Sequence, residues 1–208
     1  MILSKRASDF LQKSERENSQ LTNSEITEIF AYNNAPVSEP LIDFQKRFGG
    51  FIFYAGLEPI KFGLIKGKGG YPKFGKTAII EFEESESESP KYFFDCATTL
   101  YQMQFFLDEN GVYYEDYNAK ASSFAKAVEH LALWDEMRNR KNFELLFRDR
   151  ILKTNQIDKE LKLDFLPEAS DQYTLWFSNE DMYMQQWQGQ TTLVVSKSYP
   201  DKSKLFSL

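Results

Sequence analysis

The stretch PLIDFQKRFGGFIFYAGLEPIKFGL, residues Pro40–Leu64, contains the pattern that decides the fold. Its first part predicts an amphipathic helix, because four positions recur at helical spacing: Leu41, Phe44, Gln45 and Phe48. The pair Gly49-Gly50 ends that helix, since glycine adopts a left-handed conformation without a Cβ clash. The run FIFYAGL follows at once, and its aromatic and β-branched residues are typical of a strand. The stretch therefore predicts a helix packed on a sheet.

The chain on either side of this stretch predicts an α+β fold with a mainly antiparallel sheet flanked by helices. A capping box at Thr22–Glu25 opens one helix, and Ser122-Ser123 caps another. The turn Asp108-Glu109-Asn110-Gly111 favours a hairpin, because Asn-Gly tolerates positive φ angles. The expected strands are Phe51–Gly56, Ile60–Lys66, Thr77–Glu83, Lys91–Asp95, Gln102–Asp108 and Val112–Tyr117.

The C-terminal third predicts a helix followed by a β-meander. A charged helix is expected over Asn139–Lys153, with an apolar stripe of Phe143, Leu146, Phe147 and Ile151. The meander strands are expected at Tyr173–Phe177, Met182–Gln188 and Thr192–Ser196. We expect a polar segment over residues 1–20 and an α+β core over residues 21–137. The helix and meander of residues 138–208 are expected to pack on the same domain.

Composition limits the classes of function. Aromatic residues make up 16% of the chain, which indicates a large, ring-rich core. The net charge of −6 disfavours nucleic acid as a partner, because phosphate recognition needs a basic surface. The single Cys96 excludes an intramolecular disulfide and fits a reducing compartment. The sequence shows no signal peptide and no run of about 18 apolar residues, so we expect a cytoplasmic protein away from membranes.

The segment GYPKFGKT matches the phosphate-binding loop pattern at Gly70, Gly75, Lys76 and Thr77. In that pattern the lysine reaches the terminal phosphates and the threonine holds magnesium. The motif also requires a helix directly after it, whose N-terminal amides bind phosphate. Here TAIIEFEESESES follows, which alternates like a strand and then becomes acidic. The segment is therefore interpreted as a basic hairpin loop, with nucleotide binding kept as an alternative.

Few residues are suited to catalysis. His130, the only histidine, lies in an expected helix, and a nucleophilic triad would have to combine it with Cys96 or a serine. Carboxylate pairs such as Asp108-Glu109 could serve glycoside hydrolysis, but in an acidic chain they arise readily as solvated turns. We expect no catalytic residue, no metal site and no cofactor, and hence no enzyme.

An acidic tract and several tyrosines are the candidate partner-binding residues. A dense negative strip can steer a basic partner, although such a tract can also be a solvated loop. Tyrosines can anchor an interface, although on strands they are more often core residues. The candidates are Glu81, Glu83, Glu84, Glu86, Glu88, Tyr113, Tyr114 and Tyr117.

Three segments in the same order resemble the SUKH superfamily, which includes bacterial toxin-immunity proteins and fungal regulators of cell-wall synthesis. DFQKRFGGFIF (Asp43–Phe53) resembles the family's helix that ends in a glycine pair. FFLDENGVYY (Phe105–Tyr114) is similar to its strand, Asp-containing turn and strand. ASSFAKAVEHLAL (Ala121–Leu133) resembles its late helix. Before the first helix, the family's Leu-Pro-acidic pattern is replaced by APVSEP at Ala35–Pro40, which leaves the subfamily open.

The resemblance implies a SUKH-like α+β core over residues 21–137 and a role in binding another protein. Bacterial members typically neutralise a toxin by occluding it, so the expected partner is a basic toxin domain. A regulator or scaffold of cell-wall synthesis is the alternative role that the fungal members imply. Neither role requires turnover, in agreement with the expectation from the residues.

Overall fold

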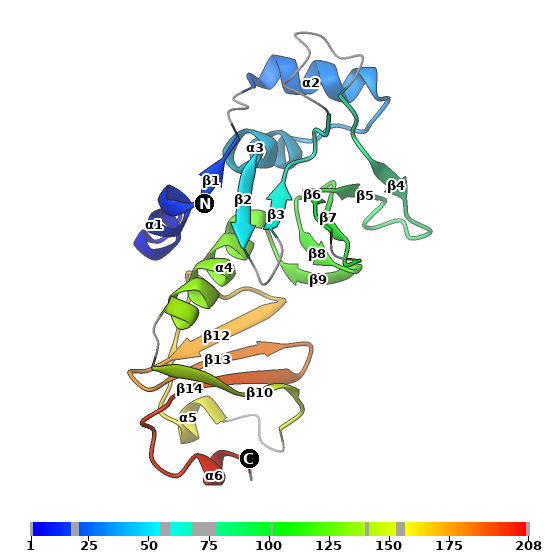
Figure 1. Ribbon diagram of the computed structural model, residues 1–208. Coiled ribbons are helices and arrows are strands. Elements are labelled where there is room, and N and C mark those ends of the chain that lie inside the picture. Colours follow the sequence, from blue (N-terminus) through cyan, green and yellow to red (C-terminus); the bar gives the residue numbers. More distant parts are fainter. Residues whose placement is uncertain are drawn as a thin grey trace. The chain divides into compact units, whose positions relative to one another are not determined.

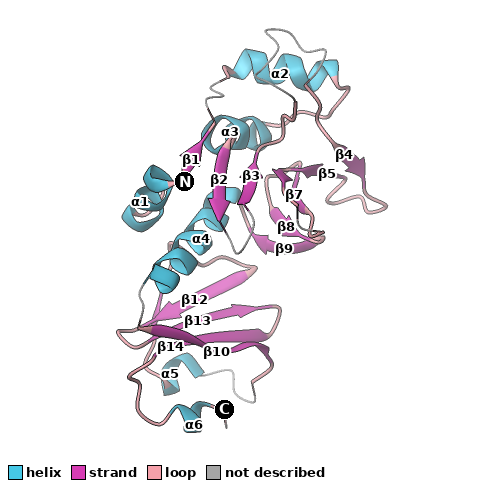
Figure 2. Ribbon diagram, in the orientation of Figure 1, coloured by secondary structure: helices cyan, strands magenta, loops and turns pink. Residues whose placement is uncertain are grey.

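The computed structural model describes residues 2–17, 21–54, 59–67, 78–100, 102–139, 142–152 and 157–206. The chain divides into two compact units. We call Asp9–Phe124 the central unit, and Met1–Ser8 together with Ala125–Leu208 the terminal unit. The described residues form helices and three antiparallel sheets, so the α+β class is confirmed (Figures 1 and 2).

The central unit contains a four-stranded and a five-stranded sheet. The first has the order β1-β2-β3-β6 and the second the order β4-β5-β7-β8-β9, with antiparallel pairing throughout. The helices are α1 (Lys5–Lys13, which begins in the terminal unit), α2 (Asn23–Tyr32) and α3 (Glu39–Phe48). The strands are β1 (Glu15–Arg16), β2 (Phe51–Tyr54), β3 (Pro59–Phe62), β4 (Phe82–Glu84), β5 (Tyr92–Asp95), β6 (Ala97–Thr98), β7 (Phe105–Asp108), β8 (Tyr113–Glu115) and β9 (Asn118–Ala121).

The helix that was predicted before the glycine pair is α3, and its four stripe residues are all buried. Its last turn packs closely on the following chain. A Cβ on Gly49 would lie 2.4 Å from the Gln45 amide, so only glycine fits there. The left-handed residue of the pair is Gly50, with φ +86°, whereas Gly49 has φ −57°. The pair therefore both ends α3 and allows β2 to start against it.

The core of the central unit is built from rings. Phe124 lies against three rings from different elements, with centroid distances of 4.7 Å to Phe44, 4.7 Å to Phe62 and 5.5 Å to Tyr113. This ring packing joins α3, β3 and β8, and such pairs add to the burial of apolar area. The high aromatic content is thus used to pack the helices on the sheets.

The terminal unit is built on one five-stranded sheet with the order β10-β14-β13-β12-β11. Its strands are β10 (Phe143–Arg150), β11 (Asp164–Phe165), β12 (Thr174–Ser178), β13 (Met182–Trp187) and β14 (Gln190–Ser196). Its helices are α4 (Phe124–Asn139, which begins with the last residue of the central unit), α5 (Ile157–Glu160) and α6 (Lys202–Leu205). The predicted meander is confirmed as β12, β13 and β14.

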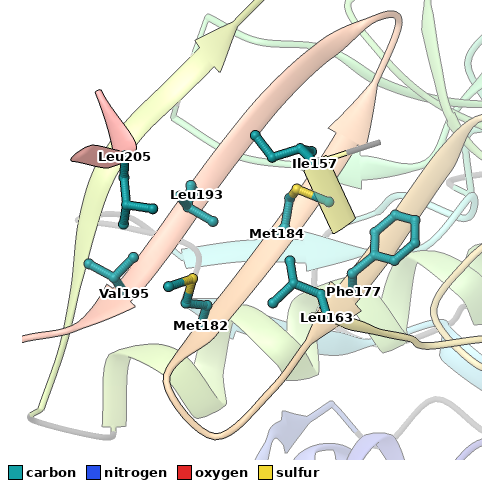
Figure 3. Packing of buried hydrophobic residues seen from close by; sticks show 8 residues of the cluster. All are labelled: Ile157, Leu163, Phe177, Met182, Met184, Leu193, Val195 and Leu205. Atoms are coloured by element: carbon teal, nitrogen blue, oxygen red, sulfur yellow. The ribbon is translucent and has the colours of Figure 1, made fainter. Parts of the chain in front are cut away.

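Both faces of this sheet are covered by apolar side chains. On one face, Met184 and Leu193 point toward Ile157 of α5, with Leu205 of α6 beside them (Figure 3). On the other face, Leu133 and Met137 of α4 pack with Trp176, Tyr183 and Val194. The strands β12, β13 and β14 therefore contribute side chains to the two cores in alternation.

The charged helix predicted over Asn139–Lys153 is wrong, because Phe143–Arg150 is the strand β10. β10 pairs with β14, and the register shifts between Leu145 and Phe147 and again between Phe147 and Arg150. Such bulges interrupt the alternation of a strand. As a result the neighbours Leu146 and Phe147 both pack on the same core. The spacing of apolar residues in this strand therefore looks like that of an amphipathic helix.

Several predicted strands are present with shorter bounds. The expected strand over Thr77–Glu83 is β4 together with an isolated bridge between Ile79 and Lys66. The expected strand over Val112–Tyr117 is β8, after which the chain turns at Asp116-Tyr117 into β9, which the sequence did not predict. In the part of the chain that the structure describes, no helix has the length and hydropathy needed to cross a membrane.

Candidate protein-binding surface

The acidic tract begins at Glu81, just before β4, and continues along β4 and the turn that leads from β4 to β5. Its carboxylates are exposed, as the sequence indicated for a solvated strip: Glu81, Glu83, Glu84, Glu86 and Glu88. Glu83 and Glu84 are successive residues of a strand, so their side chains point to opposite faces of the sheet. β4 is the edge strand of its sheet, and the tract therefore lies at the rim of the central unit's sheet.

Hydrogen bonds from the next hairpin hold the end of the acidic turn. The Glu109 carboxylate accepts from the N–H groups of Lys91 and Tyr92, at 2.9 and 3.0 Å. Partial burial opposes ionisation of Glu109, but these two N–H groups lower its pKa below the ordinary value. The Ser38 hydroxyl donates to the Glu109 carbonyl oxygen at 2.6 Å, which connects the turn to the start of α3. The tract is thus presented on an anchored hairpin.

Asp108 organises the same turn from inside. Its Oδ1 accepts from the N–H groups of Asn110 and Val112, and its Oδ2 accepts from the Tyr114 hydroxyl. Burial raises the pKa of Asp108, and these hydrogen bonds oppose the rise without cancelling it. The pair Asp108-Glu109 therefore has a structural role as the core of a turn.

One lysine lies among the carboxylates. The Lys66 ammonium is 2.7 Å from both Glu81 and Asp95. Burial would lower the pKa of Lys66, but its hydrogen bonds to Asp95 and Glu81 raise it above the ordinary value. Lys66 and Asp95 are far apart in sequence and are brought together by strand pairing: β3 with β6, the bridge at Ile79, and β4 with β5.

The three candidate tyrosines differ in their exposure. Tyr113 and Tyr114 are buried, with 5% and 8% of their surface exposed, and so belong to the core. Tyr117 is 47% exposed and follows β8 in the turn to β9. The nearby Glu83 carboxylate, as a hydrogen-bond acceptor for its hydroxyl, raises the pKa of Tyr117 to about 12. Only Tyr117 of the three therefore offers a ring to a partner.

Neither Cys96 nor His130 is arranged as a catalytic group. Cys96 is fully buried, and burial together with the nearby Asp95 charge raises the pKa of its thiol well above the ordinary value. A thiol in that state is a poor nucleophile. His130 is 8% exposed, and its Nε2 lies 2.7 Å from the Ala169 carbonyl oxygen, to which it donates as N–H. Its ring is thus engaged in holding α4 to the segment after β11.

The phosphate-loop-like residues Gly70, Gly75, Lys76 and Thr77 lie outside the described residues. The described chain resumes at Ala78 in an extended conformation and continues into β4, where the motif requires a helix. Among the described residues, no group of three or more His, Cys, Asp or Glu side chains is placed to hold a metal ion.

Comparisons with known proteins returned no match among protein-family models, curated proteins or solved structures. The SUKH resemblance of the three segments therefore stays a prediction.

Proposed function

We propose that this chain is a non-enzymatic, cytoplasmic protein-binding module, and specifically an immunity protein that neutralises a basic toxin domain by occluding it. The observation that carries the proposal is the anchored acidic hairpin: an exposed strip of glutamates whose return strand β5 is bonded at its start by Glu109, which Ser38 connects to the start of α3. A dense strip of one charge speeds the capture of a partner of opposite charge, because it steers the encounter before contact.

The charges around the hairpin support a basic partner. Of the tract carboxylates, Glu81 is paired with Lys66, and Glu84 lies 3.6 Å from Lys91. The Lys91–Glu84 pair is exposed and so contributes little to stability, whereas in the Lys66–Glu81 pair only the glutamate is exposed. The like charges of the strip repel one another, and its exposed ion pair adds little to the stability of the fold. We therefore explain the strip by recognition of a partner.

The family resemblance supports the same role from an independent direction. The segments that resemble the SUKH superfamily form α3 with β2, β7 with β8, and α4. These are scaffold elements without catalytic groups, in keeping with a binding function. The placement of Cys96 and His130 also favours binding over nucleophilic catalysis.

The direct test is protection in cells. The product of the neighbouring gene is expressed with and without this chain, and growth and complex formation are measured. We expect growth to be restored and the two proteins to be purified together. Normal toxicity in the presence of the folded chain, with no complex, would contradict the proposal. Envelope-synthesis genes in place of a toxin gene would instead favour a regulator of cell-wall synthesis.

The nucleotide-binding alternative has a separate test. Calorimetry with ATP and magnesium measures binding to the full chain and to Lys76→Ala. We expect no heat of binding with either protein. Binding that Lys76→Ala abolishes would restore the alternative.

A further inference from the structure

The outer face of the sheet beside the acidic tract combines rings with carboxylates. Strand pairing places Glu83 opposite Phe93, and Asp95 opposite Phe106. Because paired residues point to the same side of a sheet, these four side chains share one face. Tyr117 lies on that face as well, with ring centroids 4.6 Å from Phe106 and 5.4 Å from Phe93.

Tyr117 is held in an unusual position. Asp116 and Tyr117 have φ angles of +46° and +63° in the turn between β8 and β9. A two-residue turn of this kind normally carries Asn-Gly, because a bulky side chain at positive φ is disfavoured. The ring nevertheless packs against Phe106 and Phe93, and Glu83 is the cross-strand partner of Phe93, while nearly half of Tyr117 stays exposed. An exposed aromatic ring is thus presented beside a carboxylate.

The charge on this face is negative. Apart from the buried Asp108, which bonds the Tyr114 hydroxyl, Glu81, Glu83 and Asp95 carry three negative charges and Lys66 one positive charge, which gives −3 + 1 = −2. Lys66 is bound to Glu81 and Asp95, so it does not neutralise the charge of Glu83. A further cation on the exposed ring of Tyr117 would meet a carboxylate at its edge.

We propose that Tyr117 and Glu83 form a seat for an arginine side chain of the protein partner. Guanidinium fits this pair better than ammonium does, because its plane stacks on an aromatic ring while its edge donates to a carboxylate. Cation–π attraction of an exposed pair amounts to a two- to fivefold gain in affinity, equivalent to about 0.5–1 kcal/mol. This seat rests on the proposed function and adds the chemistry of the partner's anchoring residue.

The test uses N-acetyl-arginine amide as the probe and the full chain labelled with ring-¹³C tyrosine. The Tyr117 signal is assigned by its loss in Tyr117→Phe. We expect the arginine probe to shift the Tyr117 signal in a saturable way, at lower concentrations than N-acetyl-lysine amide requires, because guanidinium can stack on the ring and donate to the carboxylate at once. The exposed Tyr32 provides the internal reference and should shift little.

Two neighbouring glutamates give a matched control. Glu83→Gln and Glu84→Gln remove the same charge from the same strand, but only Glu83 lies on the face of the sheet that carries Tyr117. We expect Glu83→Gln to weaken the arginine response about two- to fivefold and Glu84→Gln to leave it nearly unchanged. Equal responses to arginine and lysine, equal effects of the two substitutions, or equal shifts at Tyr117 and Tyr32 would each overturn the seat.

Failure of the seat and failure of the proposed function have different signatures. If the partner binds and neutralising the acidic tract weakens that binding, while Tyr117→Leu and Tyr117→Phe leave it unchanged, the seat is wrong and the function stands. If the arginine probe shifts Tyr117 selectively but no basic protein partner binds the chain, the proposed function is wrong and the seat remains as a local property.

Discussion

Gln45 is a polar residue in an apolar core. Its side chain provides a hydrogen-bond acceptor for a backbone N–H group that is buried there. Its side-chain oxygen accepts from the N–H of Leu64 at 2.7 Å, and Gln45 is only 2% exposed. The sequence placed Gln45 correctly on the buried stripe of α3. It could not show the bond, because Leu64 is brought near only when β3 returns along β2.

Replacing Gln45 tests this role. Gln45→Leu should lower the free energy of unfolding by about 1–3 kcal/mol, because the buried N–H of Leu64 then has no acceptor. Urea denaturation followed by circular dichroism measures the change. Gln104→Leu, at an exposed glutamine, is the control and should change stability by less than about 0.5 kcal/mol. Equal stabilities of Gln45→Leu and the native chain would contradict the role.

Tyr117 gives a prediction on pH. Its hydroxyl bond to Glu83 raises the pKa of Tyr117 to about 12, from an ordinary value of 10.0. The neutral phenol is favoured in the folded state, so this stabilisation is present below pH 10 and is lost as the pH rises toward 12. Glu83→Gln should return the pKa toward 10, whereas Glu84→Gln should not. ¹³C NMR of the tyrosine ring carbons measures both, and an unchanged pKa in Glu83→Gln would contradict the bond.

Among the elements, α2 shows how far local sequence can go. The capping box predicted at Thr22 is confirmed, since the Thr22 side chain accepts from the Glu25 N–H and Glu25 accepts from the Thr22 N–H. β10 shows the opposite case, because its bulges depend on pairing with a strand more than 40 residues later, Gln190–Ser196. Local signals therefore located caps, turns and meander strands, while the identity of β10 was decided by tertiary pairing.

The cap of α2 can be tested by a pair of threonines. Thr22→Ala should destabilise the protein by about 1 kcal/mol, because it removes the acceptor for the Glu25 N–H. Thr27→Ala, in the middle of the same helix, should be neutral or slightly stabilising, since alanine has the higher helix propensity. Thermal unfolding compares the two. A larger loss in Thr27→Ala than in Thr22→Ala would contradict the assignment of the cap.

The β4–β5 hairpin depends on Glu109. Glu109→Ala should speed hydrogen exchange at the amides of Lys91 and Tyr92 on the order of fivefold, as expected for loss of a hydrogen bond worth ~1 kcal/mol. Glu88→Ala, an exposed residue of the same turn, is the control. Because the pKa of Glu109 is lowered in the folded state, its contribution is present above pH 4.5 and is lost as the pH falls through the folded value. Exchange in Glu109→Ala no faster than in the control would contradict the anchoring.

For the molecule as a whole, the sequence predicted where the acidic tract is, but it could not predict which other residues lie beside the tract on the surface. The tract is contiguous, so its charge was visible directly. Asp95, Lys66 and Tyr117 join it through strand pairing and a two-residue turn that no local pattern announces. Burial of Tyr113 and Tyr114 likewise follows from which face of β8 meets the core. The surface proposed to bind a partner is therefore a product of topology more than of motif.

The measurement that tests the central claim most directly is the association rate with the neighbouring gene's product. One variant changes the tract to glutamine at Glu81, Glu83, Glu84, Glu86 and Glu88. The control removes five exposed carboxylates of the terminal unit by the matching amide at Glu160, Asp164, Glu180, Asp181 and Asp201. At low salt, we predict that the association rate of the tract variant is lower by a factor of about ten or more. The control should associate nearly as fast as the native chain. Equal rates for both variants, or a rate that salt does not affect, would contradict capture through the acidic hairpin.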